Sequence, residues 1–292
     1  MGVILYFIII SLCIVTLSSS LSSTPFIRAL NGKEAPFLAI LTETDACDSS
    51  QHMKKTIDML EKVLGECNSQ NIDLIVIRVS VTTSTQKPED FQQRVVSITQ
   101  RIMQLKSKIY SQDKFHKFLV IVNDNLEAAL DGHADGVHVK GKNADSIPYI
   151  RGINKNRMKH DSGTSHDFVI GTSTHDLQSA INISRIYEPD YLFIGTCYLT
   201  SSHPEKKSLH DLEGPMLPGK VKAALVRNHK EFAFSDEKIP IIFAIGGINE
   251  MNCHEPFNNG ADGVAVIKAV SRAANPDSIV SYMKDKMIKS VK

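Results

Sequence analysis

The chain has 292 residues, of which 42% are hydrophobic and 22% are charged, and its formal net charge is +1. This composition is typical of one large globular domain, and the near-neutral charge balance without tryptophan gives no reason to expect a nucleic-acid partner. The five cysteines are widely spaced and form no Cys-x-x-Cys pair, which argues against a disulfide framework or a structural zinc site.

The first 33 residues differ from the rest of the chain. Residues 3–17 form an almost unbroken apolar run followed by serines, which is typical of a secretory signal peptide. No Lys or Arg precedes this run, so an uncleaved membrane anchor stays open. Residues 18–33 carry hydroxyl and basic side chains but no acidic ones, as in a transit peptide placed behind a signal peptide. We therefore predict a targeting segment over residues 1–33, excluded from the fold and providing the only membrane contact. It would lead the chain into the secretory pathway, toward a plastid or a secreted or lumenal compartment.

From residue 34 onward, short apolar runs alternate with helical periodicity. Strands are predicted over residues 37–41, 74–77, 118–122, 136–139, 169–170, 191–194, 241–245 and 263–267. Helices are predicted over residues 53–64, 87–109, 126–130 and 221–226, with others ending near residues 187 and 258 and a last one beginning near residue 276. Residues 158–168 are polar and are predicted to form a surface insertion.

Eight strands, each followed by a helix, predict a single (βα)8 TIM barrel over residues 34–292. The alternative is a doubly wound open sheet, which usually has fewer strands and a glycine-rich loop near its start.

The stretch over residues 240–270 gives the most specific indication of a ligand. A predicted strand ends at Gly246 and Gly247, where the backbone can take positive φ or admit a ligand closely. A short helix and another strand follow, which makes a right-handed βαβ unit. Because (βα)8 barrels hold phosphate after strands seven and eight, we predict a phosphate site here; the more conservative reading is a tight turn.

The working residues of a barrel follow the carboxyl ends of its strands. The residues at these positions are Arg78, Asn123, Asp124, His138, Ser173, Thr200, Ser202, His203, Gly246, Gly247, Ile267 and Lys268. Arg78 offers a fork for phosphate and Asp124 a carboxylate for a metal ion, so the set suits a small phosphorylated sugar or heterocycle. Structural roles stay open: Arg78 paired with Asp124, Asp124 capping the next helix, and His138 packed and hydrogen-bonded.

Several segments together resemble thiamine phosphate synthase and its TenI-type relatives. The matching segments are 121–124 (I-V-N-D), 134–139 (A-D-G-V-H-V), 171–175 (G-T-S-T-H), 195–200 (G-T-C-Y-L-T), 212–214 (L-E-G), 244–248 (A-I-G-G-I) and 260–266 (G-A-D-G-V-A-V). They occur in the family's order over residues 73–276. The resemblance implies an enzyme that joins a pyrimidine-methyl pyrophosphate to a thiazole phosphate and releases pyrophosphate, with Mg²⁺ bridging the leaving group to two carboxylates.

The resemblance also implies a role for each matching residue. Arg78 would clamp the pyrophosphate and Ser173 would hydrogen-bond the leaving group, which makes these two the expected catalytic residues. Asp124 would ligate Mg²⁺ together with the residue at position 143. The residues expected to bind the substrates are Asn123 for the pyrimidine, Thr200 and Ser202 for the thiazole, and Gly246 or Gly247, Ile267 and Lys268 for its phosphate.

The chain departs from the family pattern mainly in the pyrophosphate half of this site. The family's Gln and Lys after the second strand are Val76 and Ser80 here, the second metal carboxylate is Asn143, and a phosphate-directed Lys is His203. The thiazole-phosphate half is nearly intact, and Lys268 stands where the family usually has Ser. We therefore expect thiamine phosphate synthesis with Mg²⁺ as cofactor, and keep as alternatives a TenI-like thiazole-phosphate tautomerase or a non-catalytic phosphate-binding barrel. A homo-oligomer stays open.

Overall fold

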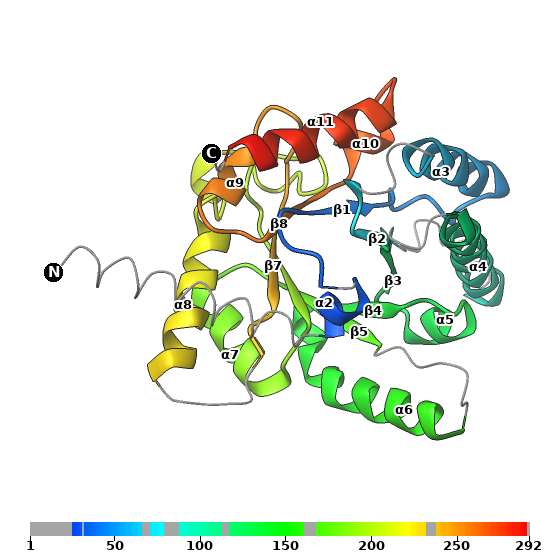
Figure 1. The fold of residues 1–292 in the computed structure, drawn as a ribbon, viewed down its shortest axis with the longest axis horizontal. Helices are drawn as coiled ribbons and strands as arrows, with labels where there is room; N and C mark the ends of the chain where they lie inside the picture. The colour runs from blue at the N-terminus through cyan, green and yellow to red at the C-terminus, as the bar shows by residue number, and fades with distance from the viewer. Residues whose placement is uncertain are drawn as a thin grey trace, which may run out of the picture.

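The computed structural model describes residues 25–30, 32–65, 71–78, 88–112, 117–160, 168–231 and 238–290. Eight parallel strands form a closed barrel in sequence order, with β8 pairing back to β1 (Figure 1). The strands are β1 (Phe37–Leu41), β2 (Leu74–Ile77), β3 (Leu119–Asn123), β4 (Gly136–Val139), β5 (Val169–Thr174), β6 (Tyr191–Ile194), β7 (Ile241–Ile245) and β8 (Gly263–Val266). The predicted TIM barrel is confirmed.

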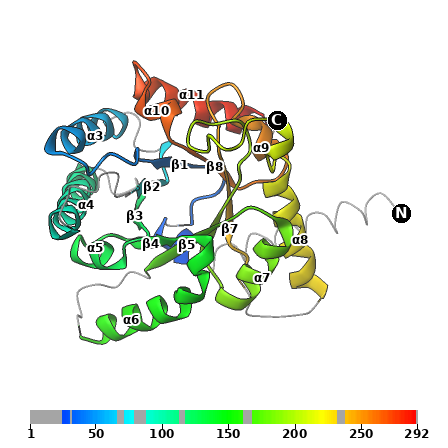
Figure 2. The same cartoon turned by 180° about the vertical axis from the view of Figure 1, so that it is seen from behind.

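Helices surround the barrel in both views (Figures 1 and 2). They are α2 (Pro25–Ala29), α3 (Ser50–Val63), α4 (Pro88–Gln112), α5 (Leu126–Asp131), the 3-10 helix η2 (Gly141–Ser146), α6 (Ile147–His160), α7 (Leu177–Tyr187), the 3-10 helix η3 (Leu209–Asp211), α8 (Leu217–Glu231), α9 (His254–Asn258), α10 (Lys268–Ser271) and α11 (Pro276–Lys289). The surface insertion predicted over residues 158–168 is wrong at its start, because residues 158–160 end α6. Residues 161–167 of that prediction lie outside the described residues.

Strands β1, β2 and β7 are continuous apolar runs because both of their faces are buried. In β1, Phe37, Ala39 and Leu41 belong to the cluster inside the barrel, whereas Leu38 and Ile40 pack in the layer between strands and helices. The third strand begins one residue later than predicted. The Tyr110 hydroxyl bonds both backbone groups of Phe118, accepting from its N–H at 2.8 Å and donating to its carbonyl at 2.9 Å, so Phe118 precedes the strand.

The amino-terminal end of the barrel is closed by α2, which lies across the opening in Figure 1 and behind the strands in Figure 2. Phe26 is fully buried, and its ring lies 5.6–5.8 Å from the rings of Phe37, Tyr191 and Phe243. Ile27 and Leu30 are buried in the same cluster. The exclusion of residues 1–33 from the fold is therefore wrong for its last part, because α2 is a component of the core.

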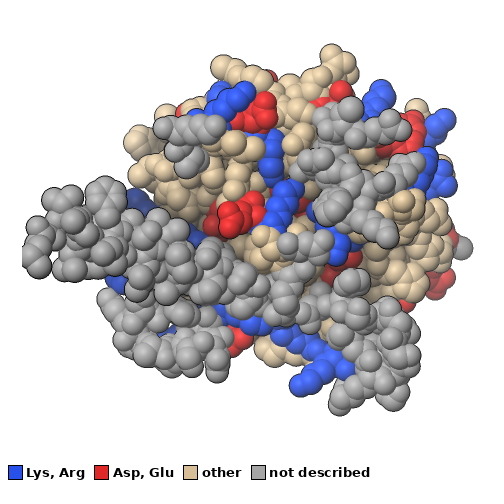
Figure 3. Space-filling model, in the orientation of Figure 1, with Lys and Arg blue, Asp and Glu red and all other residues tan. Residues whose placement is uncertain are grey.

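The predicted signal sequence over residues 3–17 lies outside the described residues. Within the described ranges, no helix combines the length and apolar character needed to cross a bilayer. On the face shown in Figure 3, acidic and basic side chains lie among one another, in keeping with the near-neutral net charge.

Candidate active site

A cavity of about 630 Å³ opens at the carboxyl ends of the strands. It is lined by the predicted catalytic and substrate-binding residues, namely Arg78, Asn123, Ser173, Thr200, Ser202, Gly246, Gly247, Ile267 and Lys268. The two predicted metal ligands, Asp124 and Asn143, are not among the residues that line it. The barrel thus brings the substrate-binding set together and leaves the metal-binding pair outside.

His138 and Ser173 lie on the neighbouring strands β4 and β5 at the floor of the cavity. His138 Nε2 is 2.8 Å from Ser173 Oγ, and His138 Nδ1 is 3.1 Å from the Tyr191 hydroxyl. The imidazole stacks on Phe193 with a centroid separation of 4.7 Å. Burial lowers the pKa of His138 to about 3, against a weak opposing effect of Asp124, so the ring is neutral. The prediction that His138 is packed and hydrogen-bonded is confirmed.

Arg78 follows β2 and is half-buried at the rim of the same cavity. Its backbone N–H donates to Thr42 Oγ1 at 2.9 Å, which fixes the chain as it leaves the strand. Burial lowers the pKa of the guanidinium, and the Glu43 carboxylate opposes this shift. Glu43 itself is 2.9 Å from Arg272 Nε, so it is already paired. Among the described residues, no carboxylate forms a salt bridge with Arg78, and the predicted pairing of Arg78 with Asp124 is wrong.

Gly246 and Gly247 form the turn after β7 with φ values of 102° and 66°. A Cβ atom on Gly246 would come within 2.6 Å of the Thr196 side chain, and one on Gly247 within 2.6 Å of the Leu199 carbonyl. The loop after β6 packs on this turn, with the Tyr198 N–H donating to the Gly246 carbonyl at 2.9 Å. Only glycine fits these two positions, and the resulting backbone lines the cavity.

Lys268, Thr200 and Ser202 border the cavity beside the glycine turn. The Lys268 ammonium donates to Ser201 Oγ, which ties the start of α10 to the loop after β6. Within that loop, the Ser202 N–H donates to Thr200 Oγ1 at 3.3 Å. The thiazole-phosphate half of the predicted site is therefore assembled from two loops that contact each other.

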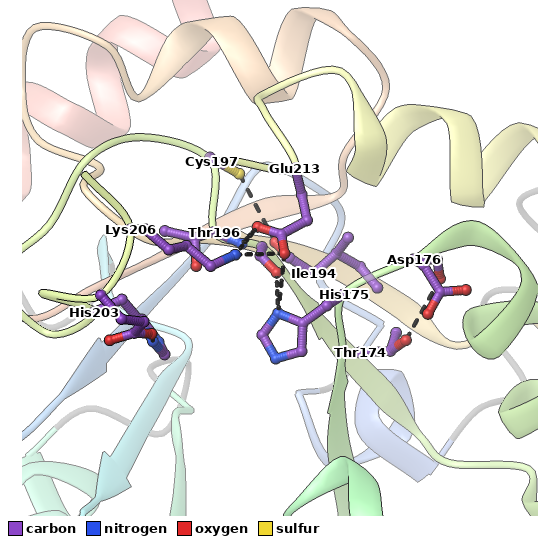
Figure 4. A network of polar contacts seen from close by, with 11 residues as sticks. Thr174, His175, Asp176, Ile194, Thr196, Cys197, His203, Lys206 and Glu213 are labelled. Atoms are coloured by element: carbon purple, nitrogen blue, oxygen red, sulfur yellow. Dashed lines mark hydrogen bonds and ion pairs between the residues drawn. The ribbon is translucent and has the colours of Figure 1, made fainter. Parts of the chain in front are cut away.

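Glu213 holds the loop after β6 in place, as Figure 4 shows. Its carboxylate accepts from the Thr196 N–H at 2.5 Å and from Lys206 Nζ at 2.5 and 2.6 Å. Burial raises its pKa, but these bonds to Lys206 and Thr196 outweigh burial and leave the pKa below its usual value. His175 Nδ1 lies 3.7 Å from Glu213 Oε1 and contacts the Gly195 carbonyl. The next residue, Asp176, caps α7 by accepting from the Ser179 N–H at 2.8 Å.

A family model described as thiamine monophosphate synthase matches residues 49–270. The chain belongs to the thiamine monophosphate synthase family. Thiamine-phosphate synthases from Listeria innocua and Chlorobium phaeobacteroides are 31% and 32% identical to it over 165 and 164 residues. These alignments cover 56% of this chain but only 65% and 66% of the two relatives, so the chain spans less than two thirds of the curated relatives it matches.

Solved structures agree on the fold. A thiamine phosphate pyrophosphorylase from Pyrococcus furiosus superposes with a TM-score of 0.60 at 20% identity, covering 88% of this chain and 97% of its own. A 3-hexulose-6-phosphate synthase from Salmonella typhimurium superposes with a TM-score of 0.50 at 13% identity, covering 87% of this chain and 100% of its own. Both likenesses concern the barrel alone.

The Mg²⁺ expected in the thiamine monophosphate synthase family does not fit the side chains present here. The Asp124 carboxylate is 2.6 Å from Lys140 Nζ, so an ammonium already neutralises it. Asn143 sits in η2 and offers no charge. No group of three His, Cys, Asp or Glu side chains within the described ranges is arranged to hold a metal ion. The proposed capping role of Asp124 is also wrong, because Asn125 caps α5 by accepting from the Ala128 N–H at 2.9 Å.

Sequence reasoning missed three charged residues of this site. Lys140 and Lys142 line the cavity just after β4, a position where the rule applied to the other strands would have found them. Glu213 lies in one of the matched family segments, yet only the structure shows that it anchors the loop after β6. Val76, which stands at the family's Gln position, is fully buried inside the barrel.

Proposed function

We propose that this protein is a thiamine phosphate synthase that joins hydroxymethylpyrimidine pyrophosphate to thiazole phosphate. The observation that carries the proposal is a cavity lined by possible anion-binding residues from two sets of strands, β2 with β5 and β7 with β8. Arg78 and Ser173 line it after β2 and at β5, and Gly246, Gly247 and Lys268 line it after β7 and β8. In this proposal each of the two phosphorylated substrates binds at one of these groups, with their reacting ends in the space between.

In the proposed reaction the bond between the pyrimidine methylene and the diphosphate oxygen breaks, and the diphosphate leaves with the electron pair. The thiazole ring nitrogen forms the new bond to the methylene carbon, giving a thiazolium cation. No proton is removed from either carbon or nitrogen, so the protein needs no base. What it must supply is alignment of the two substrates and positive charge or hydrogen-bond donors for the leaving group. We assign this task to Arg78 and to the Ser173 hydroxyl, because both line the cavity.

A TenI-like tautomerase is the alternative, and one observation favours it. The predicted metal-ligand positions do not line the cavity, whereas every predicted contact of the thiazole phosphate does. A protein that handles only the thiazole phosphate needs only that half of the site. A non-catalytic phosphate-binding barrel would use the same half without turnover.

The test is a coupling assay on the full-length chain. The two substrates are mixed with and without Mg²⁺, and thiamine phosphate is followed by mass. Arg78→Ala is the site variant, and Lys220→Gln on the exposed face of α8 is the charge-matched control. Product that is lost in Arg78→Ala and kept in Lys220→Gln supports the synthase. Binding of thiazole phosphate without product would contradict it in favour of the tautomerase, which an isomer-specific assay of the thiazole phosphate then detects.

Residues 1–24 are proposed to direct the chain into the secretory pathway, with any cleavage occurring before α2. The support is the apolar run over residues 3–17 together with the packing of α2 in the core. The amino-terminal residue of the mature protein tests this: a start after Phe26 would contradict it, because the barrel would lose its closing helix.

A further inference from the structure

A lysine, Lys140, pairs with the carboxylate that the family resemblance assigns to a metal ion. Lys140 lines the cavity and Asp124 does not, and Lys140 Nζ lies 2.6 Å from Asp124 Oδ2. The Lys140 side chain is 54% exposed, whereas that of Asp124 is 24% exposed. The carboxylate thus orients the ammonium, and the ammonium is presented to the cavity.

We propose that Lys140, held by Asp124, forms with Arg78 a binding site for the substrate diphosphate that works without a divalent metal ion. This inference rests on the proposed function, because it assigns the diphosphate half of the same cavity.

The donors needed for such a site are available. An ammonium has three N–H donors, and Asp124 occupies one side of Lys140, which leaves donors for diphosphate oxygens. Arg78 presents a planar fork that matches phosphate oxygens and stays protonated in proteins. Lys142, exposed at the same rim, adds a further positive charge. The basic residues that the chain lacks relative to the family are thus offset by lysines after β4.

A metal ion at this place would have to displace Lys140 from its carboxylate. Mg²⁺ gives up its water reluctantly and is bound through carboxylates and phosphate oxygens, but here one carboxylate is paired and Asn143 is neutral. The displaced ammonium would then lie beside the metal ion as a like charge. The described side chains therefore favour the lysine over the metal ion.

Calorimetric titration of the full-length chain with inorganic pyrophosphate tests the inference directly. In EDTA the wild-type protein should bind pyrophosphate, and adding Mg²⁺ should not tighten the binding. Lys140→Gln weakens the metal-free binding by roughly 10- to 100-fold, the range expected for losing a charged hydrogen bond. Lys220→Gln, the control at an exposed residue that does not line the cavity, should leave it unchanged. Equal effects of the two lysine variants would overturn the inference.

Asp124→Asn distinguishes most sharply between a lysine site and a metal site, because the two predict different effects of this substitution on pyrophosphate binding. If Lys140 binds the diphosphate, this variant should keep or tighten metal-free binding, because the amide oxygen can still accept from the Lys140 ammonium while the competing negative charge is gone. If Asp124 is a metal ligand, wild type binds pyrophosphate only with Mg²⁺ and Asp124→Asn abolishes that binding, which would overturn the inference. The Lys140 side chain is 54% exposed and that of Asp124 is 24% exposed, so neither substitution removes a fully buried side chain.

The coupling assay separates this inference from the proposed function. Thiamine phosphate formed only in the presence of Mg²⁺ would keep the synthase and refute the lysine site. Metal-free pyrophosphate binding that depends on Lys140, without any thiamine phosphate formed, would keep the lysine site and refute the synthase.

Discussion

His138 Nε2 and Ser173 Oγ lie 2.8 Å apart across the β4–β5 pair, at the floor of the cavity. The imidazole is buried and neutral, so one of its nitrogens donates and the other accepts. The His138 ring contacts the Tyr191 hydroxyl through Nδ1 and Ser173 Oγ through Nε2, and it thereby fixes the direction of the serine hydroxyl. Ser173 thereby presents a positioned polar group to the cavity instead of a freely rotating one.

Ser173→Ala should lower the rate of coupling by about 10- to 100-fold, because a hydrogen bond to a developing charge is lost. Binding of thiazole phosphate should stay unchanged, since its expected contacts lie on the other strands. Steady-state kinetics with each substrate varied in turn checks this. Ser97→Ala in α4 is the control, because the Ser97 hydroxyl bonds the Gln93 carbonyl of its own helix and does not line the cavity. An equal loss of thiazole-phosphate affinity would show that Ser173 does not act on the leaving group.

The stability of the protein should fall in acid partly because of His138. Its pKa is about 3 in the folded protein and about 6.5 in an unfolded chain. Between these values the unfolded chain binds a proton that the folded protein does not, so the free energy of unfolding decreases as the pH falls, by up to about 1.4 kcal/mol per pH unit. His138→Gln should remove this part of the slope. Urea unfolding at several pH values measures this slope. If the free energy of unfolding depended on pH equally in the wild type and in His138→Gln, His138 would not be the cause.

Gly247→Ala should weaken binding of thiazole phosphate roughly tenfold and lower stability by about 1–3 kcal/mol. The residue has φ of 66°, and the added methyl group would lie 2.6 Å from the Leu199 carbonyl, so the turn and the loop on it must shift. Gly152→Ala is the matched control. No atom lies within 4 Å of its added Cβ, and in α6 the change should stabilise by about 0.5–1 kcal/mol. Thermal unfolding and a titration distinguish the two, and unchanged binding in Gly247→Ala would contradict a phosphate role for the turn.

Much of the barrel follows from short-range physics. The bounds of β1, β2, β4, β6 and β7 agree with the predicted ones. Each is a short buried run that ends before a polar or small residue, and the polar side chains among them are those of His138 in β4 and Tyr191 in β6. The residues predicted to bind substrates line the cavity for a related reason: in a parallel barrel the residue after a strand lies at the mouth. The start of β3 was missed because it depends on Tyr110, which reaches it from α4.

The parts that could not be predicted depend on contacts between distant segments. Asp124 adopts φ of 54°, and its carboxylate meets Lys140, from the end of the next strand. No local pattern indicates that pairing, and the family resemblance predicts only a metal-binding role for Asp124. Likewise, α2 follows an apolar run typical of a signal peptide, and only the ring contacts of Phe26 show that it belongs to the core.

Phe26→Ala should lower the free energy of unfolding by about 3–5 kcal/mol, because a fully buried ring is removed from the closed end of the barrel. Tyr149→Ala, at a side chain that is 70% exposed, should change it by less than about 0.5 kcal/mol. Deletion of residues 1–24 should leave a folded protein, whereas deletion of residues 1–33 should not. Circular dichroism and urea unfolding measure all four variants. A stable protein without residues 1–33 would show that α2 is dispensable.

Glu213 and Lys206 should be energetically coupled, and their pair should control affinity for thiazole phosphate. Their side chains are only 16% and 17% exposed, and Glu213 also accepts from the Thr196 N–H, so the pair fastens the loop that carries Thr200 and Ser202. Glu213→Gln keeps the shape but leaves the Lys206 ammonium without its counter-charge, which should cost about 2 kcal/mol. In Lys206→Met the Glu213 carboxylate still accepts from the Thr196 N–H, so this variant should lose less free energy of unfolding than Glu213→Gln.

The double variant tests whether the two residues act as a pair. Removing both charges should cost less than the sum of the single changes by about 1 kcal/mol or more, since no partly buried charge is left unpaired. The dissociation constant for thiazole phosphate should rise in Glu213→Gln and recover in part in the double variant. Two outcomes would contradict this: additive free energies of unfolding, or an affinity for thiazole phosphate that does not change in Glu213→Gln. Either would mean that the loop is held by its backbone contacts to the Gly246 turn alone, such as the bond from the Tyr198 N–H to the Gly246 carbonyl.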